Sequence, residues 1–354
     1  MGLRIDQKIV LVTRPTQLES LKRKFSTRGQ VRFQVVSATK RELASRHRAV
    51  GGAELEKLAD QAFEEIELAG QTYDDAVEQL RRDFDFSDFD LPVQTVDRDF
   101  LPNFVFGPHD VVVTVGQDGL VANTAKYAAG LPIVAVNPDP ARIDGVLLPF
   151  RADQARAAVR AVLQGRARVR QVTLAQATLA DGQRLLAFNE LFIGNRTHVS
   201  ARYRLSVAGR TEPQSSSGVL VSTGAGSTGW LSSVFNMAAG LARAVLPNRG
   251  AGVPPASKTR STSPGVTAGT PPLRLDWEDP RLVYVVREPF ASKTSRADLV
   301  AGLLDPDHEI TIESDMAANG VIFSDGVESD YLEFNTGATA RIRTADAKAK
   351  LVIP

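Results

Sequence analysis

The run VVVTVGQDGLVANTAKYA at residues 111–128 constrains the fold more than any other part of the sequence. Its first five residues are all β-branched, which indicates a strand buried on both faces. The strand stops at Gly116-Gln117-Asp118-Gly119, and a helical pattern follows at 121–129. A strand at 133–137 and a helix at 152–163 repeat the alternation. Strands that alternate with helices predict a parallel sheet flanked by helices.

The residues before this run fit the same α/β class. Residues 8–13, KIVLVT, predict a first buried strand. Apolar residues at helical spacing predict a helix over 53–82, with an interruption expected near Gly70. Residues 31–36 are compatible with a strand or with a connection.

The pattern changes after about residue 165, where short strand-like segments predominate. Strands are predicted at 169–174, 184–193, 198–207, 218–222, 282–286, 309–313, 320–323 and 339–343, and a helix at 232–245. We therefore expect an N-terminal α/β domain over 1–152 and a β-rich domain over 153–335, followed by a C-terminal segment over 336–354. Residues 247–272 are rich in Pro, Gly, Ser and Thr, which predicts a flexible insertion.

Composition excludes several classes of protein. The formal net charge of +1 argues against a protein whose main function is to bind nucleic acid or an anionic membrane. The chain has no cysteine, so it forms no disulfide and no thiolate metal site, and its four histidines show no ligand spacing. It has no run of about 18 apolar residues that would span a membrane. Because the start lacks the character of a secretory or transit signal, we expect a cytoplasmic protein.

The turn Gly116-Gln117-Asp118-Gly119 is the first candidate site. Glycines let backbone amides approach phosphate oxygens, and the amino end of the following helix favours anions. An aspartate there can hold magnesium or accept a proton from a hydroxyl. The alternative is an ordinary strand-to-helix turn with Asp118 as the N-cap residue. The loop Asn137-Pro138-Asp139-Pro140 follows the next strand, so both loops are expected as neighbours beyond the carboxyl ends of the sheet.

Two further candidates lie in the β-rich part. The segment 222–229, STGAGSTG, follows a strand and offers small residues and hydroxyls that suit close approach of a nucleotide. A flexible serine-glycine loop is the alternative. Asn189 and Glu190 interrupt an apolar strand, where consecutive side chains point to opposite faces. An inward polar side chain is costly without a partner, and a ligand with hydroxyls or an internal hydrogen bond would supply one.

Taken in order, these segments resemble the NAD kinase family, and within it the mitochondrial type and its bacterial relatives. The resemblance covers nearly the whole chain. The matching motifs are Val10-Leu11-Val12-Thr13, Val115-Gly116-Gln117-Asp118-Gly119, residues 136–145, Asn189-Glu190-Leu191-Phe192-Ile193-Gly194, residues 217–230, Val286-Arg287-Glu288-Pro289 and Ser324-Asp325-Gly326.

The resemblance implies magnesium-dependent transfer of the γ-phosphoryl group of ATP to the 2′-hydroxyl of the adenosine ribose of NAD, which yields NADP. It makes Asp118 the general base or the metal-linked residue that orients this hydroxyl, with no other protein ligand for Mg²⁺. It implies that Asn189 and Glu190 bind ribose hydroxyls of the dinucleotide. The remaining residues expected to bind nucleotide are Gly116, Gln117, Gly119, Asn137, Thr223, Gly226, Ser227 and Thr228. The resemblance further implies a homodimer and a chain end that returns to the first domain.

Three departures from the family pattern stand out. Gln117 replaces the second glycine of the Gly-Gly-Asp-Gly-Thr loop, Leu120 replaces its threonine, and Gly224-Ala225 stands where the family has Pro-Thr. Two other functions therefore stay open. One is a kinase of the related lipid or sugar group, which shares the glycine loop, and the other is a non-catalytic dinucleotide-binding protein.

Overall fold

The computed structural model describes the chain except residues 1–6, 47–50, 86–88, 129 and 246–273. The insertion expected at 247–272 lies outside the described residues. The chain forms two compact units, unit 1 (Met1–Gln171 with Ala349–Pro354) and unit 2 (Val172–Lys348). Within the described part, no helix combines the length and apolar character needed to cross a membrane.

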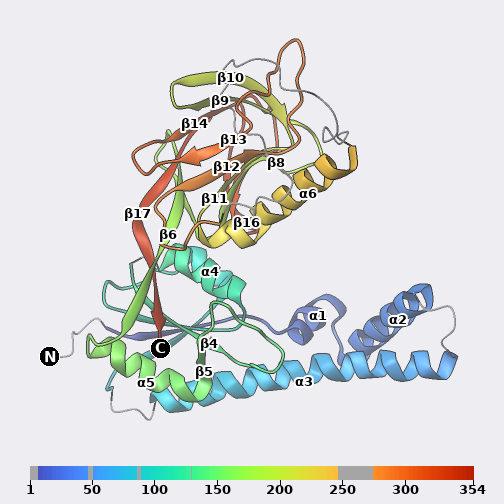
Figure 1. Cartoon of the computed structure of the whole chain (residues 1–354). Coiled ribbons are helices and arrows are strands. Elements are labelled where there is room, and N and C mark those ends of the chain that lie inside the picture. The colour runs from blue at the N-terminus through green and yellow to red at the C-terminus, as the bar shows by residue number, and fades with distance from the viewer. Residues whose placement is uncertain (1–6, 47–50, 86–88, 129, 246–273) are drawn as a thin grey trace, which may run out of the picture. The chain divides into compact units, whose positions relative to one another are not determined.

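Unit 1 is built on a parallel sheet (Figure 1). Its strands are β1 (Ile9–Thr13), β2 (Val93–Asp97), β3 (Val111–Val115), β4 (Pro132–Asn137), β5 (Phe150–Arg151) and the end of β17 (Thr339–Ile353). Along the sheet the order is β2-β1-β3-β4, and both β5 and the end of β17 pair with β4, all in parallel. The carboxyl ends of β2, β1 and β3 therefore lie side by side.

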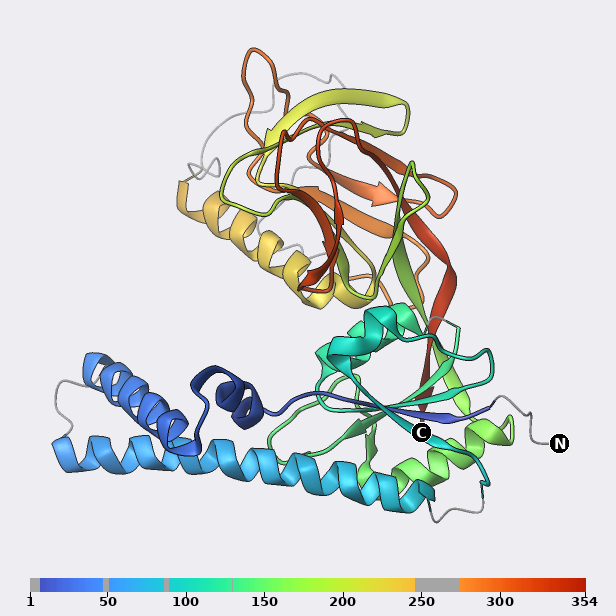
Figure 2. The same cartoon turned by 180° about the vertical axis from the view of Figure 1, so that it is seen from behind.

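Helices cover both faces of this sheet (Figures 1 and 2). The covering helices are α3 (Gly52–Asp85), α4 (Asp118–Tyr127) and α5 (Ala152–Leu163), whereas α1 (Gln17–Phe25) and α2 (Arg28–Arg46) pack on α3. The 3-10 turn η1 (Arg98–Asn103) follows β2. Buried residues of α3 and α5, among them Tyr73, Leu80 and Val159, pack on β1, β3 and β4 in one hydrophobic core. Helix α4 buries Leu120 and Val121 against the other face. The α/β class predicted for this part is confirmed.

Two local expectations for unit 1 are wrong. Residues 31–36 belong to α2 and not to a strand, because this segment has a helical partner in α3 and only Val31 is buried within it. Helix α3 runs without interruption through Gly70. A glycine costs a helix about 1 kcal/mol relative to alanine, which the packing of a long amphipathic helix offsets.

Unit 2 is a sandwich of two mainly antiparallel sheets. The six-stranded sheet has the order β13-β12-β11-β8-β15-β16, and the second contains β10-β9-β14-β17 with the β6–β7 hairpin attached to β17. Its strands are β6 (Arg168–Leu179), β7 (Arg184–Ala187), β8 (Glu190–Asn195), β9 (Ala201–Val207), β10 (Arg210–Ser216), β11 (Val219–Ser222), β12 (Leu282–Val286), β13 (Ala301–Leu304), β14 (Ile310–Ser314), β15 (Gly320–Ser324) and β16 (Val327–Glu333). Apolar residues of both sheets, such as Leu191, Leu205 and Ile342, form one core between them. The predicted β-rich class is confirmed.

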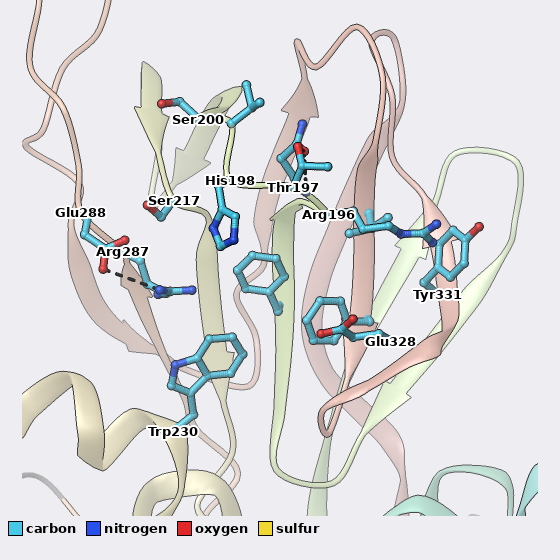
Figure 3. A pocket seen from close by; sticks show the side chains of 15 residues that line it. Arg196, Thr197, His198, Ser200, Ser217, Trp230, Arg287, Glu288, Glu328 and Tyr331 are labelled. Atoms are coloured by element: carbon cyan, nitrogen blue, oxygen red, sulfur yellow. Dashed lines mark hydrogen bonds and ion pairs between the residues drawn. The ribbon is translucent and has the colours of Figure 1, made fainter. Parts of the chain in front are cut away.

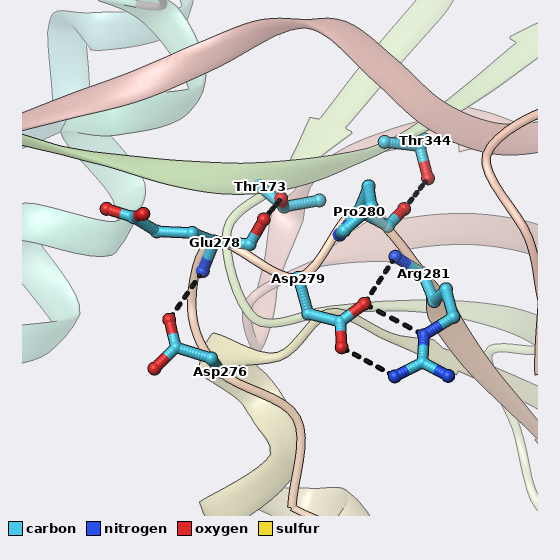
Figure 4. Close-up of polar contacts among 7 residues, drawn as sticks. All are labelled: Thr173, Asp276, Glu278, Asp279, Pro280, Arg281 and Thr344. Atoms are coloured by element: carbon cyan, nitrogen blue, oxygen red, sulfur yellow. Dashed lines mark hydrogen bonds and ion pairs between the residues drawn. The ribbon is translucent and has the colours of Figure 1, made fainter.

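The outer face of the six-stranded sheet is covered by α6 (Trp230–Val245), which follows the 3-10 turn η2 (Ala225–Thr228). Leu231 packs there with Leu220 and Val283 in a smaller core. The segment before β12 is fixed by polar contacts (Figure 4). Thr173 and Thr344 donate to the carbonyls of Glu278 and Pro280, and Arg281 forms a two-pronged ion pair with Asp279.

The boundary between the units differs from the one expected after residue 152. Helix α5 belongs to unit 1, because Ala155, Ala158 and Val159 are buried against its parallel sheet. The strand predicted over 184–193 is two strands, β7 and β8, separated by a bend at Phe188 and Asn189. That bend includes Asn189 and immediately precedes Glu190, the pair that the sequence indicated as a candidate site.

Candidate functional site

In unit 1, the Gly116–Gly119 turn joins β3 to α4. Gln117 is the N-cap residue, with φ −113° and ψ 165° and no side-chain capping bond. The alternative in which Asp118 is the N-cap is therefore wrong, since Asp118 is the first residue of α4. Gln117 also needs no left-handed backbone, so replacing the family's glycine costs no backbone strain here.

The side chain of Asp118 is half-buried and reaches the neighbouring loop. Its Oδ1 accepts a hydrogen bond from the amide of Leu147 at 2.8 Å, and its Oδ2 accepts one from the amide of Val146 at 3.2 Å. Both oxygens retain lone pairs, because a carboxylate has about four acceptor positions. The carboxylate is thus held in one orientation and can still accept a proton or a cation.

Asn137, at the end of β4, organises the same loop. Its Nδ2 donates to the carbonyl of Ile143 at 2.8 Å, and its Oδ1 accepts from the amide of Asp139 at 3.0 Å. Gly145 has φ +60°, and a Cβ there would stand 2.8 Å from Asn137 Nδ2. The loops after β3 and β4 are neighbours as predicted, since the amide of Gly116 also donates to the carbonyl of Val136.

The second departure from the family pattern has a packing explanation. Leu120 is 1% exposed, and its Cδ2 would lie 3.0 Å from a Cβ on Gly116. Leu120 thus fills space that only a glycine at 116 leaves open.

In unit 2, Asn189 and Glu190 lie at the start of β8 beside a turn that carries Asp325. The carboxylate of Asp325 accepts hydrogen bonds from three successive amides, those of Phe188 (3.0 Å), Asn189 (2.6 Å) and Glu190 (3.2 Å). Asp325 itself has φ 54°, and its amide donates to the carbonyl of Glu190. The Ser324-Asp325-Gly326 turn therefore fixes the backbone of the Asn-Glu pair. Sequence reasoning identified the Ser324-Asp325-Gly326 turn only as a motif of the family and missed Asp325 as a site residue, although a Ser-Asp-Gly turn signals a special backbone conformation.

The loop after β11 packs on the same backbone. Thr223 donates from its amide to the carbonyl of Asn189 at 2.9 Å, and its hydroxyl donates to the carbonyl of Phe188 at 2.6 Å. A Cβ on Gly226 would stand 2.2 Å from the carbonyl oxygen of Asn189, so only glycine fits there. Ser227 is buried and donates to the carbonyl of Gly224, whereas Thr228 is exposed. The loop is ordered by these contacts, and three segments far apart in the sequence meet at residues 188–190.

Gly224 is likewise required by its surroundings. A Cβ at this position would stand 1.8 Å from the carbonyl oxygen of Asp276, although the φ of −60° suits any residue. Close packing against the segment before β12 therefore explains why proline does not occupy this position.

Glu190 is the buried acid of this cluster. Glu190 is 8% exposed, and its carboxylate has no hydrogen-bond partner among the described residues. Burial, and then the charge of Asp325, raise the pKa of Glu190 from its ordinary 4.5 to about 7. A Cβ on Gly229 would stand 3.9 Å from its Oε2, so the small residue at 229 leaves the carboxylate open on that side.

A cavity of about 450 Å³ lies beside this cluster in unit 2 (Figure 3). Phe192 stacks on Trp230 with ring centroids 5.6 Å apart and contacts Phe323 at 4.9 Å. The guanidinium of Arg287 lies 5.1 Å from the Trp230 ring centroid and pairs with Glu288 at 3.6 Å. Aromatic faces suit stacking of a planar ring, and the cation beside them suits an anionic group of the same ligand.

A metal ion bound by protein side chains alone is not supported by the described residues, which contain no group of three or more Asp, Glu or His in suitable positions. Magnesium, however, usually binds through one or two carboxylates together with substrate phosphates and water. The oriented carboxylate of Asp118 fits that lesser requirement.

No protein-family model matches the chain, and no curated protein does. Solved structures do match. The crystal structure of yeast NADH kinase in complex with NADH aligns over 99% of this chain and 84% of its own, with a TM-score of 0.51 and 14% identity. An NAD kinase from Archaeoglobus fulgidus in complex with ATP aligns over 97% and 93%, with a TM-score of 0.48 and 15% identity. The likeness to the yeast enzyme shows that the chain shares its fold.

Proposed function

We propose that this chain is an NAD kinase, which transfers the γ-phosphoryl group of ATP to the 2′-hydroxyl of the adenosine ribose of NAD. The observation that carries the proposal is Glu190, a largely buried carboxylate that accepts no hydrogen bond from the described residues, at the point where residues 188–190, 223–229 and 324–326 meet. A buried acid left without donors is costly, and a ligand that offers hydroxyls removes the cost. The shared fold with a solved NADH kinase agrees with this assignment.

In this proposal, unit 2 binds the dinucleotide. The carboxylate of Glu190 accepts hydrogen bonds from ribose hydroxyls, and the side-chain amide of Asn189 donates to them or accepts from them. Gly226 lets the loop pack on the carbonyl of Asn189, and Gly229 permits close approach of the ligand. Thr228 is the exposed hydroxyl of the loop and is free to contact the ligand, whereas Thr223 and Ser227 act chiefly by ordering it. The rings of Phe192 and Trp230 offer a surface for one of the two bases.

Asp118 takes the role of general base. The 2′-oxygen of the ribose attacks the γ-phosphorus, the bond from that phosphorus to the β–γ bridging oxygen breaks, and ADP leaves. The 2′-hydroxyl proton passes to a carboxylate oxygen of Asp118, which the amides of Val146 and Leu147 hold in place. Asp118 would also contact the Mg²⁺ that accompanies ATP, and this ion would supply neutralisation of the phosphate charge. Positioning and charge are the main demands of phosphoryl transfer, so few side chains suffice.

One observation favours a second candidate, a non-catalytic dinucleotide-binding protein. Both carboxylate oxygens of Asp118 already accept amide hydrogen bonds, which would be enough to explain the residue as a support for the loop at 146–147.

A direct assay separates the two candidates. Purified protein is incubated with NAD, ATP and Mg²⁺, and the product is identified by mass spectrometry and by coupling to an NADP-specific dehydrogenase. The kinase produces NADP in proportion to the enzyme added. Binding of NAD without any NADP formation would support the non-catalytic candidate and refute the kinase.

A further inference from the structure

A second cleft lies in unit 1, at the carboxyl ends of three neighbouring parallel strands. Its volume is about 430 Å³, and it is lined by Arg14, Pro15, Ser20, Arg23, Arg98, Asp99 and Gln117. Arg14 follows β1, Arg98 follows β2 and Gln117 follows β3, while α1 contributes Ser20 and Arg23. The carboxyl ends of parallel strands are where ligands of open α/β sheets bind.

Arg14 is held in place before any ligand arrives. Its amide donates to the hydroxyl of Tyr73 at 2.8 Å, and that hydroxyl donates to the carbonyl of Val115 at 3.1 Å. Burial raises the pKa of Tyr73 to about 12, so its hydroxyl stays protonated at neutral pH and keeps this bond. The guanidinium of Arg14 lies 5.0 Å from the centroid of the Tyr73 ring. Tyr73 thus ties the ends of β1 and β3 together and supports the cation.

Arg14 also has hydrogen-bonding capacity to spare. Its Nη1 donates to the carbonyl of Pro15, but its buried Nε has no hydrogen-bond partner in the described part of the chain. This Nε lies 3.3 Å from where a Cβ of Gly116 would be, so the cation packs directly on the turn that precedes Asp118.

The cleft is strongly positive. It contains three arginines and one carboxylate, Asp99, which among the described residues forms its ion pair with Arg23 at 3.5 Å. Both side chains of this pair are more than half exposed, and such pairs contribute little, so an anion readily displaces Asp99. The side chain of Arg98 makes no hydrogen bond or ion pair with the described residues. At the start of α4, the amides of Asp118 and Gly119 likewise donate to no described residue.

We propose that this arginine cleft binds the polyphosphate chain of the phosphoryl donor, with Arg14 and Arg98 as the principal contacts. The inference rests on the proposed kinase function and names the donor's binding residues within it. Guanidinium groups and helix-start amides form short, charge-assisted hydrogen bonds with phosphate oxygens. The lining contains no aromatic side chain that would hold a base, so the cleft recognises phosphates and not the nucleoside.

Binding of inorganic tripolyphosphate tests the site without any need for catalysis. Calorimetric titrations compare wild type with Arg14→Gln and Arg98→Gln. Arg32→Gln is the matched control, because Arg32 is an exposed arginine of unit 1 that pairs with Asp60 on the α2–α3 hairpin. Each cleft variant should weaken binding about tenfold or more, and the control should stay within about twofold. Wild-type affinity in Arg98→Gln, or equal loss in the control, would overturn the proposal.

Arg98→Gln keeps the test informative even if Arg14→Gln fails to fold, because the side chain of Arg98 makes no hydrogen bond or ion pair with the described residues. Steady-state kinetics then separate the cleft from the function as a whole. The cleft variants should raise the KM for ATP and leave the KM for NAD unchanged. If the Arg98→Gln variant is active and has the KM for ATP of wild type, the proposed phosphate site is wrong, but the proposed kinase function is not. Arginine-dependent tripolyphosphate binding without NADP formation would refute the kinase but not the cleft.

Discussion

Glu190 and Asp325 show how two acids a short distance apart take different roles through their surroundings. Asp325 accepts three amide hydrogen bonds, which satisfy its charge inside the fold. Glu190 is buried without such donors, so its charged form is destabilised. One acid therefore supports the backbone, and the other is available to a ligand.

The raised pKa of Glu190 predicts a pH dependence that Glu190→Gln should remove. A pKa above the unfolded value means that the native state holds the proton more tightly. Its contribution to stability is complete below about pH 4.5 and is lost as the pH rises to about 7. At pH 8 the glutamine variant should therefore be more stable than wild type by up to about 3 kcal/mol, and less so at pH 5. Denaturant titrations at both pH values measure the difference.

The same variant tests the ligand. Ribose hydroxyls that donate to Glu190 favour its ionised form, so the affinity of wild type for NAD should rise between pH 5 and 8. Glu190→Gln should bind NAD more weakly and show a flat profile over that range. If the stability difference between variant and wild type is the same at both pH values, the buried-acid account of Glu190 is wrong.

At the scale of elements, the loop after β11 depends on Gly224. Gly224→Ala would place a Cβ 1.8 Å from the carbonyl oxygen of Asp276, which requires the loop or the segment before β12 to move. We expect a loss of about 1–3 kcal/mol in stability together with weaker NAD binding. Gly240→Ala in α6 is the control, because nothing lies within 4 Å of its Cβ, and it should stabilise by about 1 kcal/mol. Equal melting temperatures for the two variants would show that the loop does not need this glycine.

Helix α3 offers a second test at this scale. A Cβ on Gly70 would meet Leu18 and Thr16 at 3.9 Å, which is ordinary contact. Since the helix is continuous there, Gly70→Ala should stabilise the protein by about 0.5–1 kcal/mol. Thermal unfolding measures the change in stability. The control Ala69→Gly should lower the stability by a similar amount. A marked destabilisation by Gly70→Ala would indicate that the helix bends at this residue.

Across the whole molecule, the sequence predicted best where burial leaves few options. Strand β3 is an unbroken run of β-branched residues, and α5 has regular amphipathic spacing, so both were found at their observed bounds. Edge strands such as β10, with Glu212, Pro213 and Gln214, carry too little apolar pattern to be recognised. An edge strand is stabilised mainly by pairing with a neighbouring strand, and its own sequence does not identify that neighbour.

The site was predictable by motif but not by geometry. Asn189 and Glu190 were identified because they interrupt an apolar strand, and residues 222–229 because small and hydroxyl-bearing residues follow a strand. Three features appear only once the chain is folded: the support from Asp325, the occupied carboxylate of Asp118 and the arginine cleft. Arg14, Arg23 and Arg98 are separated in sequence, and only the order β2-β1-β3 brings them to one edge.

The turnover of Asp118→Asn tests the central claim most directly, when it is measured together with NAD affinity and thermal stability. Asp144→Asn is the control, because Asp144 is an exposed carboxylate in the adjacent loop. If Asp118 is the general base, its kcat should fall by about 10² or more. NAD affinity should hardly change, since the proton moves only with the phosphoryl group. Loss of one amide bond should lower stability by only about 1 kcal/mol. A folded Asp118→Asn variant with the kcat of wild type and of Asp144→Asn would contradict the account.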